Sequence, residues 1–192
     1  MSLIRSFIAV ELPQELQKEL AELEAKLKKN CPPVVKWVDP DSIHITLKFL
    51  GETSEDSIKK LMLAIEEAAQ GIPPFKLEVR DTGAFPNLER VQVIWVGVKG
   101  ELDIITQLQK RIEINTEQLG FPHESRAFSP HLTLGRVRDD TGLNDRLRMG
   151  KLLADTHFTS SHNVDVKALN LIKSQLTAAG PIYTRIGSVQ LK

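Results

Sequence analysis

The 192-residue chain has one cysteine, no net charge and no long apolar run, and each of these shortages excludes a class of protein. Cys31 stands alone, which rules out an intramolecular disulfide framework and any zinc site built on cysteines, and is compatible with a reducing compartment. Lys plus Arg and Asp plus Glu both number 25. This balance argues against a protein that coats long nucleic acid, but it leaves room for a local pocket that binds one phosphate.

Membrane and secretory segments are also missing. No stretch approaches the roughly 18 to 20 apolar residues of a membrane span. The opening MSLIRSFIAVELP has a short apolar run before Glu11 and no small-residue cleavage site, so it predicts a first strand rather than a signal peptide. We therefore expect a cytoplasmic protein with no membrane partner. The glycines fit neither a P-loop nor a dinucleotide fingerprint.

Strands and long helices alternate without a regular βαβ period, which predicts an α+β fold with largely antiparallel sheets. No linker or shift of composition divides the chain, so residues 1–192 are expected to form a single domain. Apolar stripes predict helices over 13–29, 55–69 and 102–119. A loop is expected over 81–89, and Gly51 is expected to stop the strand before it. Strands are expected over 5–12, 34–38, 43–50, 75–79, 91–98, 131–137, 164–172 and 183–191.

Two of these strands carry the same polar pair. His44 and Thr46 lie in the strand 43–50, and His131 and Thr133 lie in the strand that starts 87 residues after His44. Residues i and i+2 share one face of a strand, so each histidine points the same way as its threonine. Two such pairs indicate a pseudo-symmetric cleft that holds two imidazoles and two hydroxyls around one anionic group.

Simpler explanations exist for each pair. A histidine in a strand is usually a surface or hydrogen-bonded core residue, and threonine is a common strand former. Two nearly matching copies, HITL and HLTL, in otherwise apolar strands favour a functional role, because a buried imidazole needs a partner. A zinc site would want a third ligand, and no acidic residue lies beside either pair, so neither a metal nor another cofactor is expected. The G-x-S-x-G elbow of serine hydrolases is missing.

The remaining chemistry is acid–base catalysis on a phosphate ester. One imidazole can accept a proton near neutral pH while the other donates one. Threonine hydroxyls can donate hydrogen bonds to phosphate oxygens, and Arg136, just after the second pair, can offer a bidentate fork. This set is suited to the attack of water on a phosphodiester without a metal. A nucleotide or RNA-end binding module that uses the same anion site without turnover is the alternative.

The chain resembles the 2H phosphoesterase superfamily, and within it the RNA 2',3'-cyclic phosphodiesterases, also called 2'-5' RNA ligases. The resemblance covers nearly the whole length and implies two pseudo-symmetric lobes of antiparallel sheet flanked by helices, with a V-shaped cleft between them. It implies metal-independent opening of a terminal 2',3'-cyclic phosphate to a 2'-phosphate, and a reversible ligation that forms 2'-5' linkages. The matching segments are RSFIAVELP, KWVDPDSIHITLKFLGE, GAFPN, RVQVIWVGV, SPHLTLGRV and LIKSQLTAAGPIYTRI.

The resemblance also implies roles for individual residues. His44 and His131 match the catalytic pair, Thr46, Thr133 and Arg136 match phosphate-binding residues, and Phe49 matches an aromatic residue near the substrate. The implied partners are RNA ends or nucleoside 2',3'-cyclic phosphates, and a monomer is expected.

Strict alternation along a strand conflicts with two of these roles. Phe49 and Arg136 each lie five positions after their histidine, which would place them on the opposite face unless a bulge intervenes. Gly135 makes a bulge easy before Arg136, whereas Phe49 can equally be a core residue. The other basic residues considered for RNA contact are each expected to be solvated, and they are Arg5, Lys48, Arg126, Lys173 and Arg185. The two other aromatic candidates, Trp37 and Tyr183, are expected to be structural.

Overall fold

The architecture is α+β, as the sequence predicts, in a computed structural model that describes residues 3–178 and 180–192. Within these residues the strands pair in antiparallel fashion throughout. The strands are β1 (Leu3–Glu11), β2 (Val35–Trp37), β3 (His44–Ser54), β4 (Phe75–Phe85), β5 (Val93–Gly100), β6 (His131–Val137), β7 (Val164–Val166), β8 (Ala168–Thr177) and β9 (Gly180–Gln190). The helices are α1 (Gln14–Asn30), α2 (Glu55–Ala69), α3 (Leu102–Glu117) and α4 (Leu143–Ala154), with a short 3-10 helix η1 (Pro40–Ser42).

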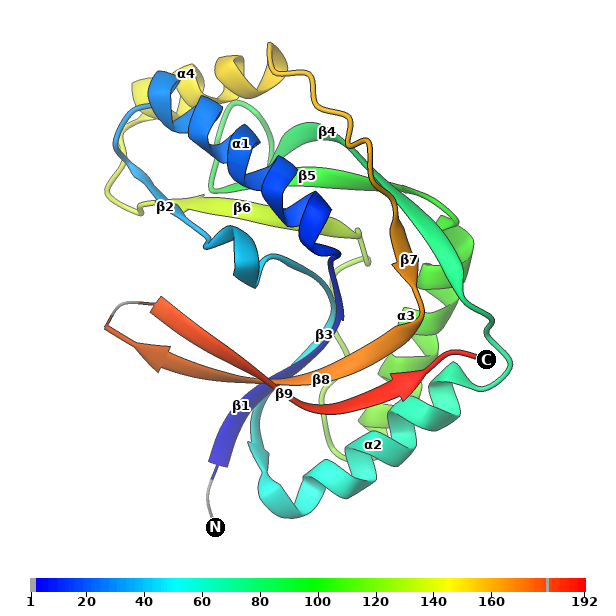
Figure 1. The fold of residues 1–192 in the computed structure, drawn as a ribbon. Helices are drawn as coiled ribbons and strands as arrows, with labels where there is room; N and C mark the ends of the chain where they lie inside the picture. Colours follow the sequence, from blue (N-terminus) through cyan, green and yellow to red (C-terminus); the bar gives the residue numbers. More distant parts are fainter. Residues whose placement is uncertain (1–2, 179) are drawn as a thin grey trace.

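One curled sheet runs through both lobes. Its order is β7-β4-β5-β6-β3-β1-β8-β9, and β2 pairs with β6 beside this path. The two lobes join at β3 and β6, where Ile45 and Leu132 are the single registered pair. The rest of that β6 edge pairs with β2. In the sheet order, β3 and β1 stand between β6 and the β8–β9 hairpin, and Figure 1 shows the hairpin on the other side of the junction from β2 and β6.

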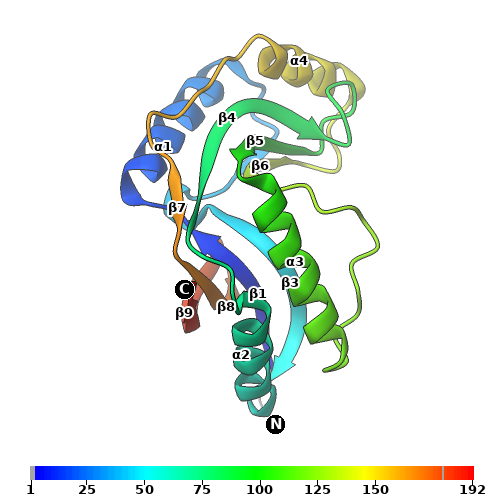
Figure 2. The same ribbon diagram turned by 90° about the vertical axis from the view of Figure 1, so that its right-hand side faces the viewer.

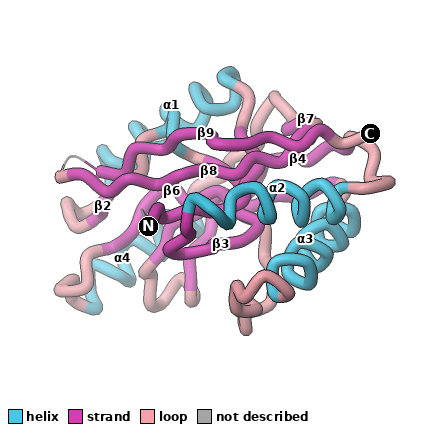
Figure 3. The backbone as a smooth tube through the Cα atoms, turned by 90° about the horizontal axis from the view of Figure 1, so that it is seen from below, coloured by secondary structure: helices cyan, strands magenta, loops and turns pink. Residues whose placement is uncertain are grey.

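The helices cover the outer side of the curled sheet. Helices α2 and α3 lie beside the lobe made of β1, β3, β8 and β9, while α1 and α4 lie beside the other lobe (Figures 1 and 2). Figure 3 shows α2 and α3 next to each other along one side of the strands. Helix α1 buries a stripe at spacings of four and three, made of Leu16, Leu20, Leu23 and Leu27. No helix of the described residues is long and apolar enough to cross a membrane.

Three of the expected boundaries within the sheet are wrong. Strand β3 continues through Gly51 to Ser54, because Gly51 adopts a φ of 70° and the strand stays paired with β1. Most of the expected 81–89 loop belongs to β4, which passes Asp81 (φ 66°) through a bulge and reaches Phe85. The expected strand 164–172 is two strands, β7 and β8.

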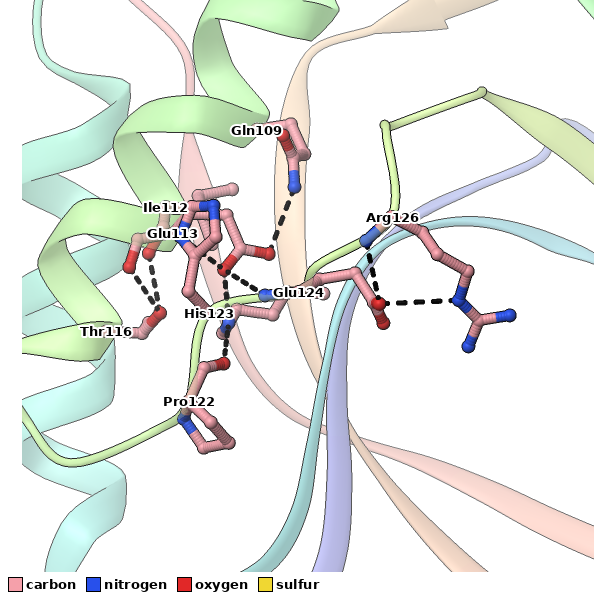
Figure 4. A network of polar contacts seen from close by, with 9 residues as sticks. Gln109, Ile112, Glu113, Thr116, Pro122, His123, Glu124 and Arg126 are labelled. Carbon is pink, nitrogen blue, oxygen red and sulfur yellow. Dashed lines mark hydrogen bonds and ion pairs between the residues drawn. The ribbon is translucent and has the colours of Figure 1, made fainter.

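A buried ion pair lies beneath the junction and ties three segments together. Lys48 is only 4% exposed, and its Nζ donates to Glu113 Oε2 of α3 at 2.5 Å and to the Pro122 carbonyl at 2.8 Å. The expectation of a solvated Lys48 is therefore wrong. Gln109 Nε2 and the Glu124 amide also donate to the Glu113 carboxylate, at 3.0 and 3.3 Å (Figure 4). These bonds fasten the segment 121–130, which leads into β6, to α3 and β3.

We expect Lys48→Met to lower the free energy of unfolding by about 3 kcal/mol, because it removes the ammonium group that pairs with the buried Glu113 carboxylate and leaves only the exposed His123 ring, 3.5 Å away, as a basic neighbour. The double variant Lys48→Met with Glu113→Met should be less destabilised than the single variant, since it removes both charges. Urea unfolding measures both. Lys76→Met is the control, because its pair with Asp165 at 3.9 Å is exposed and contributes little. A single variant no less stable than this control would contradict a structural role for the pair.

Candidate functional site

The Ile45–Leu132 pair at the junction of the lobes brings the two His/Thr pairs together. Both apolar side chains are fully buried on the core side of the sheet. Continuing this antiparallel register by one residue in each direction places His44 opposite Thr133 and Thr46 opposite His131. Because directly opposite residues share a face, the four polar side chains lie together on the face turned away from the core. All four are partly buried.

Each imidazole is held by a backbone carbonyl two residues before it. Nδ1 lies 2.7 Å from the Ser42 carbonyl oxygen in His44 and 2.7 Å from the Ser129 carbonyl oxygen in His131. A carbonyl oxygen only accepts, so Nδ1 carries the hydrogen and donates it. Nε2 is then the nitrogen that can take up or release a proton at the site. Both copies also share the longer sequence pattern S-x-H-x-T-L, in which the serine contributes the backbone carbonyl.

Two matching bulges settle the positions of Phe49 and Arg136. In β3 the register against β1 shifts between Ile8 and Ala9, and in β6 the register against β5 shifts between Ile94 and Trp95. Two consecutive residues then point into the core in each strand, Leu47 with Lys48 and Leu134 with Gly135.

After the bulges, Phe49 and Arg136 return to the face of their own histidines. Phe49 is 68% exposed, so its interpretation as a core residue is wrong. Arg136 is also exposed. At Gly135 the neighbouring strand β2 comes so close that an added Cβ would lie 2.7 Å from the side-chain atom Val35 Cγ1 and 3.2 Å from the Lys36 carbonyl oxygen. Phe49 and Arg136 are therefore both exposed on the face of the sheet that carries the two His/Thr pairs.

Aromatic rings surround the two imidazoles unequally. The ring of Phe7 stacks on His44 with centroids 4.6 Å apart and planes 23° apart. Tyr183 meets His44 edge-on at 5.3 Å, and Phe85 meets His131 edge-on at 4.9 Å. The sequence did not identify Phe7 or Phe85, because alternation says which residues share a face but not which face lines the site. Tyr183 had been expected to be structural only.

Burial makes both histidines weaker bases than usual. It lowers the pKa of His44, and the hydrogen bond to the Ser42 carbonyl offsets part of this effect. The pKa of His131 is also lowered by burial, is raised in part by its bond to the Ser129 carbonyl, and is lowered further by the positive charge of Arg136. Both imidazoles are therefore predominantly neutral near pH 7 in the free protein.

A pocket of about 520 Å³ opens beside His44, between η1 and the β8–β9 hairpin. Its volume lies in the usual range for small-molecule sites. It is lined by Glu11, Leu12, Gln17, Asp39, Asp41, Ser42, Ile43, His44, Ile172, Pro181, Ile182, Tyr183 and Arg185. A larger surface hollow, about 1100 Å³, lies between α2 and β9 and contains neither histidine. In the described part of the chain no group of three or more His, Cys, Asp or Glu side chains is placed to hold a metal ion.

Comparison with known proteins gives a consistent result. The profile of a family described as LigT like phosphoesterase matches twice, over residues 10–95 and 96–183, and each match contains one His/Thr pair. The RNA 2',3'-cyclic phosphodiesterase of Methanothermobacter thermautotrophicus is 32% identical over 181 residues, which cover 94% of this chain and 95% of that protein. The protein of the same name from Methanocaldococcus jannaschii is also 32% identical, over 183 residues, with 94% and 96% covered.

Solved structures agree over the full length. The structure of TT0787 from Thermus thermophilus has a TM-score of 0.80 at 26% identity and covers 98% of each chain. Escherichia coli LigT in complex with 3'-AMP has a TM-score of 0.79 at 25% identity, with 100% of this chain and 99% of that chain covered.

We expect both imidazoles to titrate below the usual histidine pKa of about 6.5 in the free protein, because burial disfavours the charged form. Inorganic phosphate should raise both pKa values, since an anion between the rings stabilises the imidazolium. NMR titration of the ring protons measures this, and the spectra of His44→Ala and His131→Ala assign the two rings. A pKa of 6.5 or above without phosphate, or pKa values that phosphate leaves unchanged, would contradict the proposed anion site.

Proposed function

Because this chain belongs to the LigT-like phosphoesterase family, we propose that it opens the terminal 2',3'-cyclic phosphate of RNA to a 2'-phosphate without a metal ion. The observation that carries the proposal is the meeting of two His/Thr pairs at the β3–β6 junction, each histidine with its Nε2 left to exchange a proton. Relatives that cover most of the chain are named RNA 2',3'-cyclic phosphodiesterase.

The chemistry needs one base, one acid and donors for the phosphate oxygens. One Nε2 takes a proton from water as the water oxygen bonds to phosphorus. The other Nε2 gives a proton to the 3' oxygen of the ribose as the P–O3' bond breaks, which leaves a 2'-phosphate and a 3' hydroxyl. Thr46, Thr133 and Arg136 donate to the non-bridging oxygens, where negative charge increases in the transition state. Phe49 offers an exposed ring on which a nucleobase can stack.

Two contacts break the symmetry and favour His131 as the base and His44 as the acid. The charge of Arg136 acts on His131 and disfavours its protonated form, as a base requires. The stacked ring of Phe7 offers a π-face to His44, and a π-face attracts a cation. The same groups can serve a ligation in the same roles. If the 5' hydroxyl of a second RNA replaces water, the product is a 2'-5' linkage, and we include this ligase reaction in the proposal.

Binding without turnover is the alternative function. A module that only holds a phosphate needs hydrogen-bond donors, which Thr46, Thr133 and Arg136 supply. Two carbonyl-oriented imidazoles with lowered pKa values go beyond this need and support an enzyme.

Both His/Thr pairs come from one chain, which supports a monomer that works as a single domain, 1–192. The free Cys31 is compatible with the cytoplasm as the site of action.

We expect His44→Ala and His131→Ala each to reduce kcat on a nucleoside 2',3'-cyclic phosphate by about 10² to 10⁴, because each removes one proton transfer. The double variant should fall far less than the product of the two losses, since both groups act in one displacement. The assay contains EDTA, and circular dichroism checks that the variants fold. Wild-type protein that is inactive in EDTA but regains activity with added metal would contradict metal independence. A folded single variant with near-normal kcat would contradict the two-histidine mechanism.

The acid and base roles predict different responses to the leaving group. A substrate whose leaving group is a much weaker base than a ribose oxygen needs no general acid, so it should restore most of the rate to His44→Ala. The same substrate should restore little to His131→Ala, which still lacks the base for water. Steady-state kinetics with an aryl phosphodiester, compared with the natural cyclic phosphate, measure this. Rescue confined to His131→Ala would reverse the assignment.

A further inference from the structure

Arg5 lies on the same face of the sheet as the candidate site, one strand away from it. Successive residues of β1 alternate between faces, so Arg5 shares its face with Phe7, which stacks on His44, and with Ala9, which pairs with Thr46. Four residues of strand separate Ala9 from Arg5, which is ~13 Å. A long arginine side chain on this face can therefore reach a group next to the phosphate site but not the phosphate between the histidines.

An aromatic floor fills the space between Arg5 and the histidines. Phe7 contacts the rings of both Phe49 and Tyr183, with centroids 6.1 and 5.2 Å away. The charges of Arg136 and Arg5 both lower the pKa of Tyr183, against the larger raising effect of burial. The phenol of Tyr183 is thus within the electrostatic reach of two guanidinium groups. Phe7 itself is buried, and the exposed ring of Phe49 and the partly exposed ring of Tyr183 are inclined to it by 50° and 79°. Accessible rings close to two guanidinium groups are suited to a nucleoside that carries a phosphate on each side.

Arg5 is also available for a ligand. Arg185, on the neighbouring hairpin, is already paired with Glu11 at 3.2 Å, and Glu11 accepts a further bond from Asn170. Arg5 has no acidic partner within 4.0 Å among residues 3–178 and 180–192, although Glu52 is its cross-strand neighbour. Arg5 is exposed, and in a strand of a β-sheet its position is held by hydrogen bonds on both sides.

We propose that Arg5 forms a second phosphate subsite, which binds the phosphodiester one nucleotide 5' of the terminal cyclic phosphate. The inference rests on the proposed function and adds a contact to it, because the enzyme would also bind the RNA strand at the phosphodiester beyond the terminal nucleoside. The terminal nucleoside lies over the aromatic floor, its 2',3' phosphate between the histidines and its 5' phosphate on Arg5. Glu52 opposes this binding, because its carboxylate lies across from Arg5 and repels the same phosphate.

The test compares two ligands that differ only in the 5' phosphate. Isothermal titration calorimetry measures the Kd of a nucleoside 2'-monophosphate and of the corresponding nucleoside 2',5'-bisphosphate. We expect wild type to bind the bisphosphate about tenfold more tightly, the value of one hydrogen-bonded contact with a charged group. Arg5→Gln should abolish this preference and leave the Kd of the monophosphate unchanged. Glu52→Gln should increase the preference, and Lys59→Gln on α2 is the control with the same loss of charge far from the cleft.

Salt dependence gives an independent readout. The slope of log Kd for the bisphosphate against log salt should be smaller in Arg5→Gln than in wild type by about 0.7, as expected for one lost phosphate contact on a single strand. Equal weakening of both ligands by Arg5→Gln would overturn the inference and assign Arg5 to the phosphate between the histidines. A wild type that does not distinguish the two ligands would overturn it as well.

Turnover of a nucleoside 2',3'-cyclic phosphate is measured in parallel and tests the proposed function separately. The two tests are independent because the 2'-monophosphate and the 2',5'-bisphosphate can bind without any catalysis. Arg5→Gln should turn over this substrate at the wild-type kcat/KM. With a dinucleotide that ends in a 2',3'-cyclic phosphate, kcat/KM of the variant should fall about tenfold. A variant that loses activity equally on both substrates would again place Arg5 at the reacting phosphate and contradict a second subsite.

Discussion

The register of Ile45 against Leu132 is the constraint on which the rest of the site depends. It is the single registered pair between the two lobes along β3 and β6, and both side chains are fully buried. A slip of one residue in either strand would bring the polar residues of that strand into the core and its apolar residues to the cleft. The free energy of burying two aliphatic side chains, about 1.5 to 3 kcal/mol each, therefore also fixes where His44 and His131 stand relative to each other. Catalytic geometry and core packing are set here by the same contact.

The two halves of the site reach the same backbone geometry by different means. Each strand has a bulge after its His/Thr pair, and each bulge turns the residue five positions after the histidine back to the cleft. In β6 the residue before Arg136 is Gly135, because β2 packs against it and leaves no room for a side chain. In β3 the corresponding residue is Lys48, whose charge is buried and compensated by Glu113 and the Pro122 carbonyl. The backbone is pseudo-symmetric, whereas the side chains differ, so one half supplies an arginine and the other an aromatic ring.

Much of this could be predicted from sequence, and the failures have physical causes. The α+β class, the three long helices and the shared face of each His/Thr pair follow from local periodicity, and all rest on interactions along one strand or helix. Lys48 was expected to be solvated because its partner Glu113 is 65 residues away, and no local pattern announces such a pair. Phe49 was ambiguous because a bulge without glycine leaves no mark in the sequence. Phe7 was not identified because alternation defines two faces of β1 but not which of them meets the cleft. Contacts between distant segments decided each of these cases.

The surroundings of the histidines bear on how the proposed mechanism can use an acid and a base together. Burial keeps both imidazoles predominantly neutral in the free protein, so the base is already in its working form. The acid is not, because Glu11, the cross-strand neighbour of His44, is already paired with Arg185 at 3.2 Å. The phosphate itself can produce the acid, because a bound anion raises the pKa of the imidazoles that flank it. In the proposed mechanism Arg136 pairs with the phosphate and reduces this effect on the pKa of His131, so His44 is the histidine expected to gain the proton. Substrate binding would then produce the acid only when there is a leaving group to protonate.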